Sequence, residues 1–254
     1  MSSVHSANTV RIEIAAHCIE SALAAQAGGA DRVELFSNPL EGGVTPSEGL
    51  IAGARRALKI PLHVMIRPRG GDFHYSNHEL EVMRNDIAVA QRLGANGVVF
   101  GLVNVDGMVD VVRTRELVNL AKPLAVTFHR AFDLCRDLHR AVEDVISCGA
   151  DRVLTSGGEE TALKGIPVLA KLVDIAGGRI GIAAAGGIRP ENAQQIVRQT
   201  GVQEVHAGLR SRLSSPMRFR NEKVRFGTAQ LSEYERMVVT EHDVRQFVQQ
   251  LGRI

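Results

Sequence analysis

A repeated seven-residue pattern constrains the fold of this chain more strongly than any other feature. Residues 29–35 read GADRVEL and residues 149–155 read GADRVLT, and weaker copies begin at Gly94 and Gly201. In each copy a glycine ends a helix-patterned stretch and a short β-branched run follows, as expected where a helix C-cap leads into a strand. The four copies therefore predict four helix-to-strand junctions.

Four more strand-like runs alternate with these copies. They are residues 10–15, 62–66, 124–128 and 180–185, and helical patterns follow them, for example at residues 21–27, 80–93, 138–148 and 191–199. Eight strands alternating with eight helices imply parallel pairing through right-handed crossovers. In a chain of 254 residues this predicts a single-domain TIM (β/α)8 barrel over residues 10–254, after a flexible N-terminal segment, residues 1–9. A doubly wound open sheet is the alternative, but no Gly-x-Gly-x-x-Gly motif follows the first strand.

The alternation of side chains along each strand predicts which of them point into the barrel. Val33 and Leu35 are expected to face the helices. The polar side chains expected inside are Glu13, Glu34, Arg67, His129 and His206. Buried charges must pair or serve a ligand, so this set is either an ion network that closes the barrel or an acid–base site. On the second interpretation Glu13, Glu34 and His129 are candidate catalytic groups and His206 is a candidate ligand contact.

A dense group of polar residues follows the third strand. Residues 67–75 read RPRGGDFHY. The planar guanidinium groups of Arg67 and Arg69 match a carboxylate or phosphate, and the glycines allow close approach of the backbone. Arg67, Arg69 and Asp72 are therefore candidate ligand contacts, and a salt-bridged turn is the alternative.

The ends of the fifth and sixth strands add further candidates. Residues 128–133 read FHRAFD, in which His129 and Asp133 are the candidate catalytic residues. Asp133, like Asp72, has the alternative of capping turn amides in its own loop. Ser156 follows the sixth strand and is a candidate ligand contact. None of the five lysines lies at a strand end, which argues against Schiff-base chemistry.

Two glycines follow the seventh strand, in the sequence AAGGIRPEN of residues 184–192. Gly186 and Gly187 can present backbone amides to an anion, and Pro190 is suited to open the next helix. The loops after strands seven and eight form the usual phosphate site of TIM barrels, and Arg210 would add positive charge there. These residues predict a small ligand bearing a phosphate or carboxylate, and a simple tight turn is the alternative.

Composition excludes several classes of function. A net charge of +2, no tryptophan and only two tyrosines argue against a nucleic-acid partner. The first ten residues are polar, which predicts no signal peptide, and no apolar run approaches the roughly 18 residues of a membrane span. Three cysteines without a CxxC motif fit a reducing cytoplasm.

Two of the cysteines are weak candidates for metal binding. Cys18 and Cys135 follow the first and fifth strands, and thiolates are the ligands that copper(I) favours. These two strands lie opposite each other in an eight-stranded barrel. Ordinary half-buried thiols are therefore the simpler interpretation.

Several motifs together resemble the CutC family. They are EGGVTPS at residues 41–47, RPRGGDF at 67–73, FHRAFD at 128–133, RVLTSG at 152–157 and SPMRFR at 215–220. The resemblance spans about residues 10–250 and implies a cytoplasmic TIM barrel, a homodimer and a role in copper homeostasis. Family members often carry cysteines just after the first strand and at the end of the second, where this chain has Ala15, Ala16 and Phe36. Cys135 matches a cysteine that commonly follows the FHRAFD motif.

The resemblance thus predicts a copper homeostasis protein with weak copper binding. The residues themselves favour another class, an enzyme or binder that acts on a small anionic metabolite by acid–base chemistry at the barrel mouth. A catalytically inactive scaffold is a third possibility. The segment from 209 to 240 is long for one connection after the eighth strand, and we expect it to pack over the mouth or into a dimer interface.

Overall fold

Eight parallel strands close into one barrel in chain order. The computed structural model describes residues 10–221, 223–226 and 232–252, so the expected flexible segment, residues 1–9, lies outside the described residues. The strands are β1 (Arg11–Ala16), β2 (Arg32–Leu35), β3 (Leu62–Met65), β4 (Gly97–Phe100), β5 (Ala125–Phe128), β6 (Arg152–Thr155), β7 (Gly181–Ala184) and β8 (Glu204–Ala207). Because β8 pairs with β1, the sheet closes, which confirms the predicted TIM barrel and excludes the open sheet.

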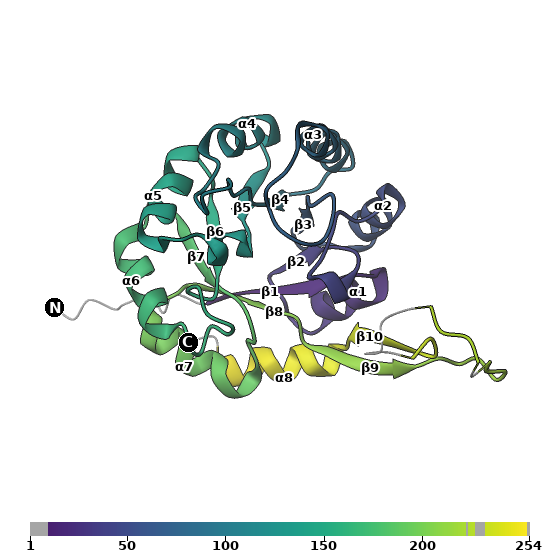
Figure 1. Cartoon of the computed structure of the whole chain (residues 1–254). Coiled ribbons are helices and arrows are strands. Elements are labelled where there is room, and N and C mark those ends of the chain that lie inside the picture. Colours follow the sequence, from purple (N-terminus) through teal and green to yellow (C-terminus); the bar gives the residue numbers. More distant parts are fainter. Residues whose placement is uncertain (1–9, 222, 227–231, 253–254) are drawn as a thin grey trace.

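A ring of helices surrounds the barrel (Figure 1). They are α1 (Ile19–Ala27), α2 (Glu48–Ala57), α3 (Asn77–Arg92), α4 (Val111–Ala121), α5 (Leu138–Cys148), α6 (Ile166–Ala176), α7 (Pro190–Thr200) and α8 (Glu241–Leu251). Two short 3-10 helices, η1 (Pro39–Glu41) and η2 (Arg130–Leu134), lie in the loops after β2 and β5. Apolar side chains of the strands and helices form one large core between the two layers.

The glycine, aspartate and arginine of the repeated GADR pattern each have a structural role. Gly149 ends α5 with a φ of 84°, in the left-handed region that glycine adopts without a Cβ penalty. The carboxylates of Asp31 and Asp151 accept the backbone N–H of Ile12 and Val126, which ties the repeat to the preceding strand. The arginine that follows each aspartate is buried in the barrel interior. The repeat therefore encodes helix end, strand pairing and barrel filling at once.

The predicted inward and outward directions are confirmed by the core. Val33 and Leu35 belong to the large core that faces the helices. Two small apolar clusters are separate from it and fill part of the barrel interior. They consist of Ala15, Phe36, Met65 and Val99, and of Leu154, Ala183 and Ala185.

A buried polar network fills the N-terminal end of the barrel. Arg32 pairs with Glu13 and, at 2.6 Å, with Glu204, while Arg152 bonds Thr127 at 3.2 Å. Arg152 also lies 3.2 Å from the ring of His63. The ion network expected as an alternative to an acid–base site is thus present at this end.

Glycines on neighbouring strands make room for these large inward side chains. A Cβ on Gly97 would lie 2.6 Å from the ring of His63, and one on Gly181 would lie 2.9 Å from Arg152. The contacts are close because each glycine sits directly opposite the large residue in the strand ladder. Each of these large polar side chains in the barrel therefore lies opposite a glycine on the next strand, which leaves the space that it occupies.

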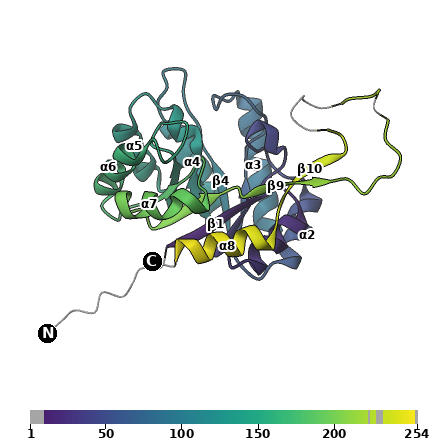
Figure 2. The same cartoon turned by 90° about the horizontal axis from the view of Figure 1, so that it is seen from below.

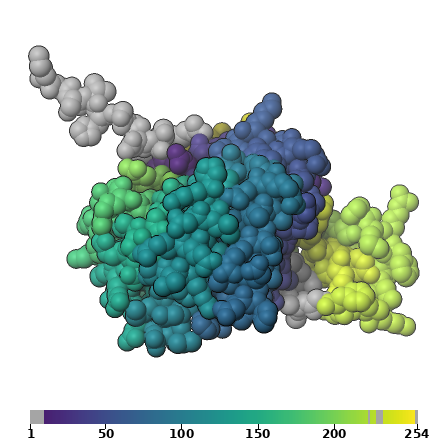
Figure 3. All heavy atoms as spheres, turned by 90° about the horizontal axis from the view of Figure 1, so that it is seen from above, coloured from purple at the N-terminus to yellow at the C-terminus, as the bar shows by residue number. Residues whose placement is uncertain are grey.

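The long connection after β8 forms a projecting hairpin. Its strands β9 (Arg210–Ser214) and β10 (Glu235–Val239) pair antiparallel. Figures 2 and 3 show this hairpin extending sideways from the barrel. Its base lines the mouth through Arg210, Arg212 and Met237, and the packing of its outer part into a dimer interface stays a prediction. In its described outer part the side chains of Phe219 and Phe226 are exposed.

No helix in the described part of the chain is long and apolar enough to cross a membrane.

Candidate functional site

A cavity of about 800 Å³ opens at the C-terminal ends of the barrel strands. Its wall combines residues from the ends of β1, β2, β7 and β8, from the loop with η1 and from the base of the hairpin. Its charged or titratable lining residues are Glu34, Arg130, Arg189, His206, Arg210 and Arg212. Active sites of TIM barrels form at this end of the strands, so the position matches the predicted mouth.

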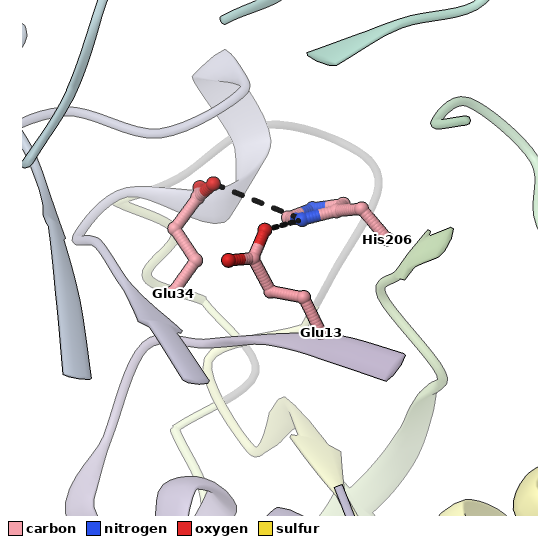
Figure 4. A group of neighbouring side chains, drawn as sticks. All are labelled: Glu13, Glu34 and His206. Carbon is pink, nitrogen blue, oxygen red and sulfur yellow. Dashed lines mark hydrogen bonds and ion pairs between the residues drawn. The ribbon is translucent and has the colours of Figure 1, made fainter. Parts of the chain in front are cut away.

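Glu13, Glu34 and His206 meet at the base of this mouth, where Glu34 and His206 line the cavity and Glu13 lies beneath them (Figure 4). The Nδ1 atom of His206 lies 2.7 Å from Glu13 and 3.7 Å from Glu34. The three residues come from β1, β2 and β8, which are neighbours in the closed sheet. Their side chains are almost fully buried, with 3%, 4% and 14% exposed in that order.

The two carboxyl groups have opposite electrostatic environments. Burial alone would raise the pKa of Glu13, but Arg32 and His206 outweigh it and hold that pKa well below its usual range. Burial raises the pKa of Glu34 to about 7, and the charge of Glu13 adds to this effect. The pKa of His206 is raised: burial lowers it, but Glu34 and Glu13 oppose burial and prevail. The cluster therefore holds one ionised carboxylate beside a carboxyl that titrates near neutral pH.

The spacing of this cluster raises the question of a metal. One ligand atom from each of the three residues lies within 4.8 Å of the others, and it is the one such group of His, Cys, Asp or Glu in the described part of the chain. However, Arg32 already pairs with Glu13, and four arginines line the cavity above. A cation would meet this positive charge, so we assign no metal to the cluster.

Two arginines at the rim face the cavity without an acidic partner. Arg189 and Arg210 form no ion pair with any carboxylate in the described part of the chain, whereas Arg130 pairs with Asp133 and Arg212 with Glu235. The pKa of Arg210 is lowered by burial and by the positive charge of Arg189. The two like charges therefore repel each other across the rim, and an anion between them would relieve this repulsion.

The glycines of the seventh loop lie beside these arginines in the cavity wall. Gly186 and Gly187 have φ values of 92° and 67°, which other residues rarely adopt. Arg130 packs directly against Gly186, where a Cβ would lie 3.1 Å from the guanidinium. Their N–H groups donate to no other group among the described residues. Backbone amides and guanidinium groups thus line the same wall.

Arg67 lies behind this wall rather than in it. Its guanidinium donates to the carbonyl oxygens of Glu41, Gly43 and Gly71 at 2.7–2.8 Å, and it stacks on Phe73 at 4.7 Å. The position predicted for a ligand contact is thus used to hold two loops together. The reason is that the loop with η1 folds over the end of β3 and brings its carbonyl groups to the guanidinium.

The other residues of the RPRGGDF segment form a surface network. Arg69 bonds Glu79 and Asp72, and the Asp72 side chain is 72% exposed. Neither residue lines the cavity. The salt-bridged turn expected as the alternative describes these two residues.

His129, Asp133 and Ser156 also have internal partners. The Nδ1 atom of His129 accepts the N–H of Ala131, and burial together with Arg67 lowers its pKa to about 3. Asp133 accepts hydrogen bonds from Thr155, from Ser156 and from the N–H of Gly158, so it caps the loop after β6 rather than the amides of its own loop. Ser156 in turn donates to the carbonyl oxygen of Glu159. None of the three lines the cavity.

The cysteines do not assemble a thiolate site. Cys18 donates to Ser21, and Cys135 is buried and donates to the carbonyl oxygen of Ala131. Burial raises the pKa of Cys135 to about 12, with Asp133 and Asp144 adding to it. Neither cysteine belongs to a group of three metal-ligating side chains among the described residues. A copper(I) site built on these thiols does not fit the structure.

Two cavity residues were missed as candidates by the sequence reasoning. Arg130 lies within the FHRAFD motif, and Arg189 directly precedes the proline that opens α7. An arginine beside a strand-end glycine pair was the available signal for Arg189. No local pattern indicated that Arg130 reaches across to the glycines after β7.

Comparisons with known proteins identify the family of the chain. The CutC family matches residues 10–211. A CutC family protein of Bacteroides thetaiotaomicron is 48% identical over 241 residues, covering 94% of this chain and 97% of that protein. The copper homeostasis protein cutC homolog of Homo sapiens is 44% identical over 240 residues, covering 94% and 88%. A crystal structure of a CutC protein from Streptococcus agalactiae, 33% identical, superposes with a TM-score of 0.75 over 78% of this chain and 97% of that one. The chain therefore belongs to the CutC family.

Proposed function

We propose that this protein binds a small anionic metabolite in the mouth cavity and acts on it by acid–base chemistry. The observation that carries the proposal is the pair Arg189 and Arg210, which face the cavity without a carboxylate partner in the described part of the chain. Guanidinium groups beside backbone amides at a helix N-terminus are a common setting for phosphate or carboxylate. The fold places this setting after β7 and β8, where TIM barrels commonly hold phosphate.

The chemistry at the floor supports an acid–base role. Glu34 titrates near neutral pH, which suits a group that gives and takes protons under physiological conditions. The cavity lining contains no lysine, so covalent imine chemistry has no nucleophile among the described lining residues. A cavity of about 800 Å³ is large enough for a phosphorylated metabolite.

Titration calorimetry with inorganic phosphate tests the binding proposal. We expect saturable binding to the full chain, and loss of ~tenfold or more in affinity for the double variant Arg189→Gln, Arg210→Gln. Arg84→Gln is the matched control, because Arg84 lies on α3 and bonds Glu81 and Glu116, away from the cavity. Equal phosphate affinity in both variants and the wild type would reject the proposal.

A role in copper homeostasis is the second candidate function. It is supported by the names of the human and mouse relatives, which are 44% and 45% identical to this chain. The arrangement of Cys18 and Cys135 leads us to propose weak copper(I) binding at most. Metal analysis after incubation with copper(I) under reducing conditions tests it: retention of a full equivalent would establish a tight site, and less than a tenth of an equivalent would exclude one.

We also propose that the protein is cytoplasmic and a homodimer. The dimer proposal rests on the projecting hairpin, which exposes Met217, Phe219 and Phe226. Sedimentation of the full chain tests it, and a monomer at micromolar concentration would contradict it.

A further inference from the structure

We propose that Glu34 is the catalytic acid–base residue of the mouth, and that its substrate has two ends. A phosphate is held at the rim by Arg189 and Arg210, and a carbonyl or carboxylate oxygen at the other end contacts Glu34. This inference rests on the proposed anion site and adds the identity of the catalytic group and the class of substrate.

Glu34 is the member of its cluster with a carboxyl oxygen that has no hydrogen-bond partner in the described part of the chain, although the Nδ1 atom of His206 lies 3.7 Å from it. Its Oε2 atom is buried and has no hydrogen-bond partner among the described residues, and the side chain lines the cavity. In Glu13, by contrast, Oε2 accepts from Arg32 and Oε1 contacts His206. Glu13 also does not line the cavity. Glu13 is therefore a positioning residue, and Glu34 is the carboxyl-bearing residue that borders the cavity.

An unpartnered buried carboxyl oxygen is costly, which points to a ligand in the working protein. A polar atom buried without a partner costs about 1–3 kcal/mol in general. A substrate oxygen that accepts a hydrogen bond from protonated Glu34 would remove this cost. The same arrangement lets the carboxyl pass its proton to the substrate or take one from it.

The charged groups around Glu34 determine when it carries that proton. They are Glu13 on β1, Arg32 on its own strand β2 and His206 on β8. His63 lies directly opposite Glu34 on β3, but burial lowers the pKa of its ring to about 3 and leaves it neutral. Glu13 raises the proton affinity of Glu34, whereas His206 and Arg32 lower it. Because Arg32 is bound to Glu13, burial prevails and Glu34 stays protonated up to near neutral pH.

The rim and the floor together define the two-ended ligand. The rim carries the guanidinium groups of Arg189, Arg210 and Arg212, and the floor carries Glu34 and His206. A phosphate alone would bind the arginines of the rim. It would leave the protonated carboxyl of Glu34 at the floor without a hydrogen-bond acceptor. A small phosphorylated molecule with a carbonyl or carboxylate group would bind the rim arginines through its phosphate and accept a hydrogen bond from Glu34 at its other end.

Two small ligands distinguish binding at the floor from binding at the rim. Methyl phosphate carries the rim group alone, and 2-phosphoglycolate adds a carboxylate at the other end. We expect 2-phosphoglycolate to bind about tenfold more tightly than methyl phosphate at pH 6, when Glu34 is protonated and donates a hydrogen bond. At pH 8 this ratio should fall by about threefold or more, and binding should take up close to one proton, because the ligand carboxylate favours protonated Glu34.

The variant Glu34→Gln provides the decisive comparison. Its amide keeps a hydrogen-bond donor but cannot titrate, so the ratio of the two affinities should become independent of pH and the proton uptake should vanish. Arg84→Gln should behave as the wild type. If Glu34→Gln does not fold, the buffer dependence of the binding enthalpy in the wild type still measures the proton uptake.

The possible failures are distinguishable. If both probes bind with equal affinity at pH 6 and at pH 8, the inference about Glu34 is overturned while the anion site stands. If neither probe binds, the proposed function fails as well. A pH-dependent ratio that persists in Glu34→Gln would assign the proton to another group and also overturn the inference.

Discussion

Glu34 lies beside Glu13 in the barrel interior, yet burial raises the pKa of the first carboxyl while cationic partners lower the pKa of the second. The difference follows from the contacts of one side chain, since Arg32 bonds Glu13 and leaves Glu34 without a hydrogen bond. Two carboxyl groups with separated pKa values are the usual basis of acid–base catalysis with carboxylates.

The raised pKa of Glu34 predicts that this residue destabilises the fold as the pH rises. The unfolded chain loses the proton near the ordinary pKa of 4.5, whereas the folded protein keeps it up to about 7. Between these values the folded state binds more protons, so the free energy of unfolding falls with increasing pH, by about 3 kcal/mol in total. In Glu34→Gln this loss should be absent, which urea unfolding at pH 5 and pH 8 would measure. Glu81→Gln on the surface of α3 is the control, and a Glu34→Gln variant less stable than the wild type at pH 8 would contradict the prediction.

The hydrogen bonds of Arg67 predict a structural effect rather than a loss of ligand. Arg67→Met removes the donor to three carbonyl groups and should lower the free energy of unfolding by about 2–4 kcal/mol. Arg84→Met should cost less than about 1 kcal/mol, because its ion pairs are on the surface. Urea unfolding measures both variants. Unchanged stability of Arg67→Met together with weaker phosphate binding would instead identify Arg67 as a ligand contact.

The close approach of Gly97 and His63 predicts a steric conflict in a simple substitution. In Gly97→Ala the new Cβ would lie 2.6 Å from the imidazole, which should cost about 1–3 kcal/mol in stability. Adding His63→Ala should relieve the conflict, so the double variant should be more stable than the sum of the single effects by about 0.5 kcal/mol or more. Gly49→Ala in α2 is the matched control, because its nearest neighbour lies 4.0 Å away. Strict additivity in thermal unfolding would show that His63 moves aside freely.

The burial of Cys135 predicts that its thiol is unreactive in the folded protein. With a pKa of about 12 instead of the ordinary 9, its thiolate fraction at pH 8 should be about three orders of magnitude below that of an ordinary thiol. Iodoacetamide should therefore modify the half-buried Cys18 first, and Cys135 only after unfolding in urea. Peptide mass spectrometry measures the order. Rapid modification of Cys135 in the native protein would revive it as a metal-ligand candidate.

Much of the fold was predictable because its signals are local. The glycine that ends a helix, the short strand after it and the alternation of faces are all encoded within a few residues, as in residues 149–155. The same alternation correctly turned Glu13, Glu34 and His206 into the barrel. The position of the projecting hairpin was harder to predict, because no local pattern in residues 209–240 indicates whether another surface covers its apolar side chains.

The candidate site was only partly predictable, because residue type does not specify partners. Arg67 and Arg210 are both arginines that follow barrel strands, but Arg67 donates to three loop carbonyls and is buried, whereas Arg210 donates to one, that of Pro39, and lines the cavity. Asp133 carries the charge of a catalytic group, but the amides of the loop after β6 occupy its oxygens.

The sequence by itself determined the alternation of strands and helices, the closed barrel and the set of polar side chains that point inward, because these follow from local periodicity and chain length. The tertiary structure decided which of those side chains pair with other protein groups and which remain available to bind a ligand. The contact between Glu13 and His206 joins residues 193 positions apart, and it exists only because β8 closes against β1. Charge pairing and desolvation act through space. The Glu34 oxygen without a hydrogen bond, and Arg189 and Arg210 without a carboxylate partner among the described residues, therefore became apparent only in the folded chain.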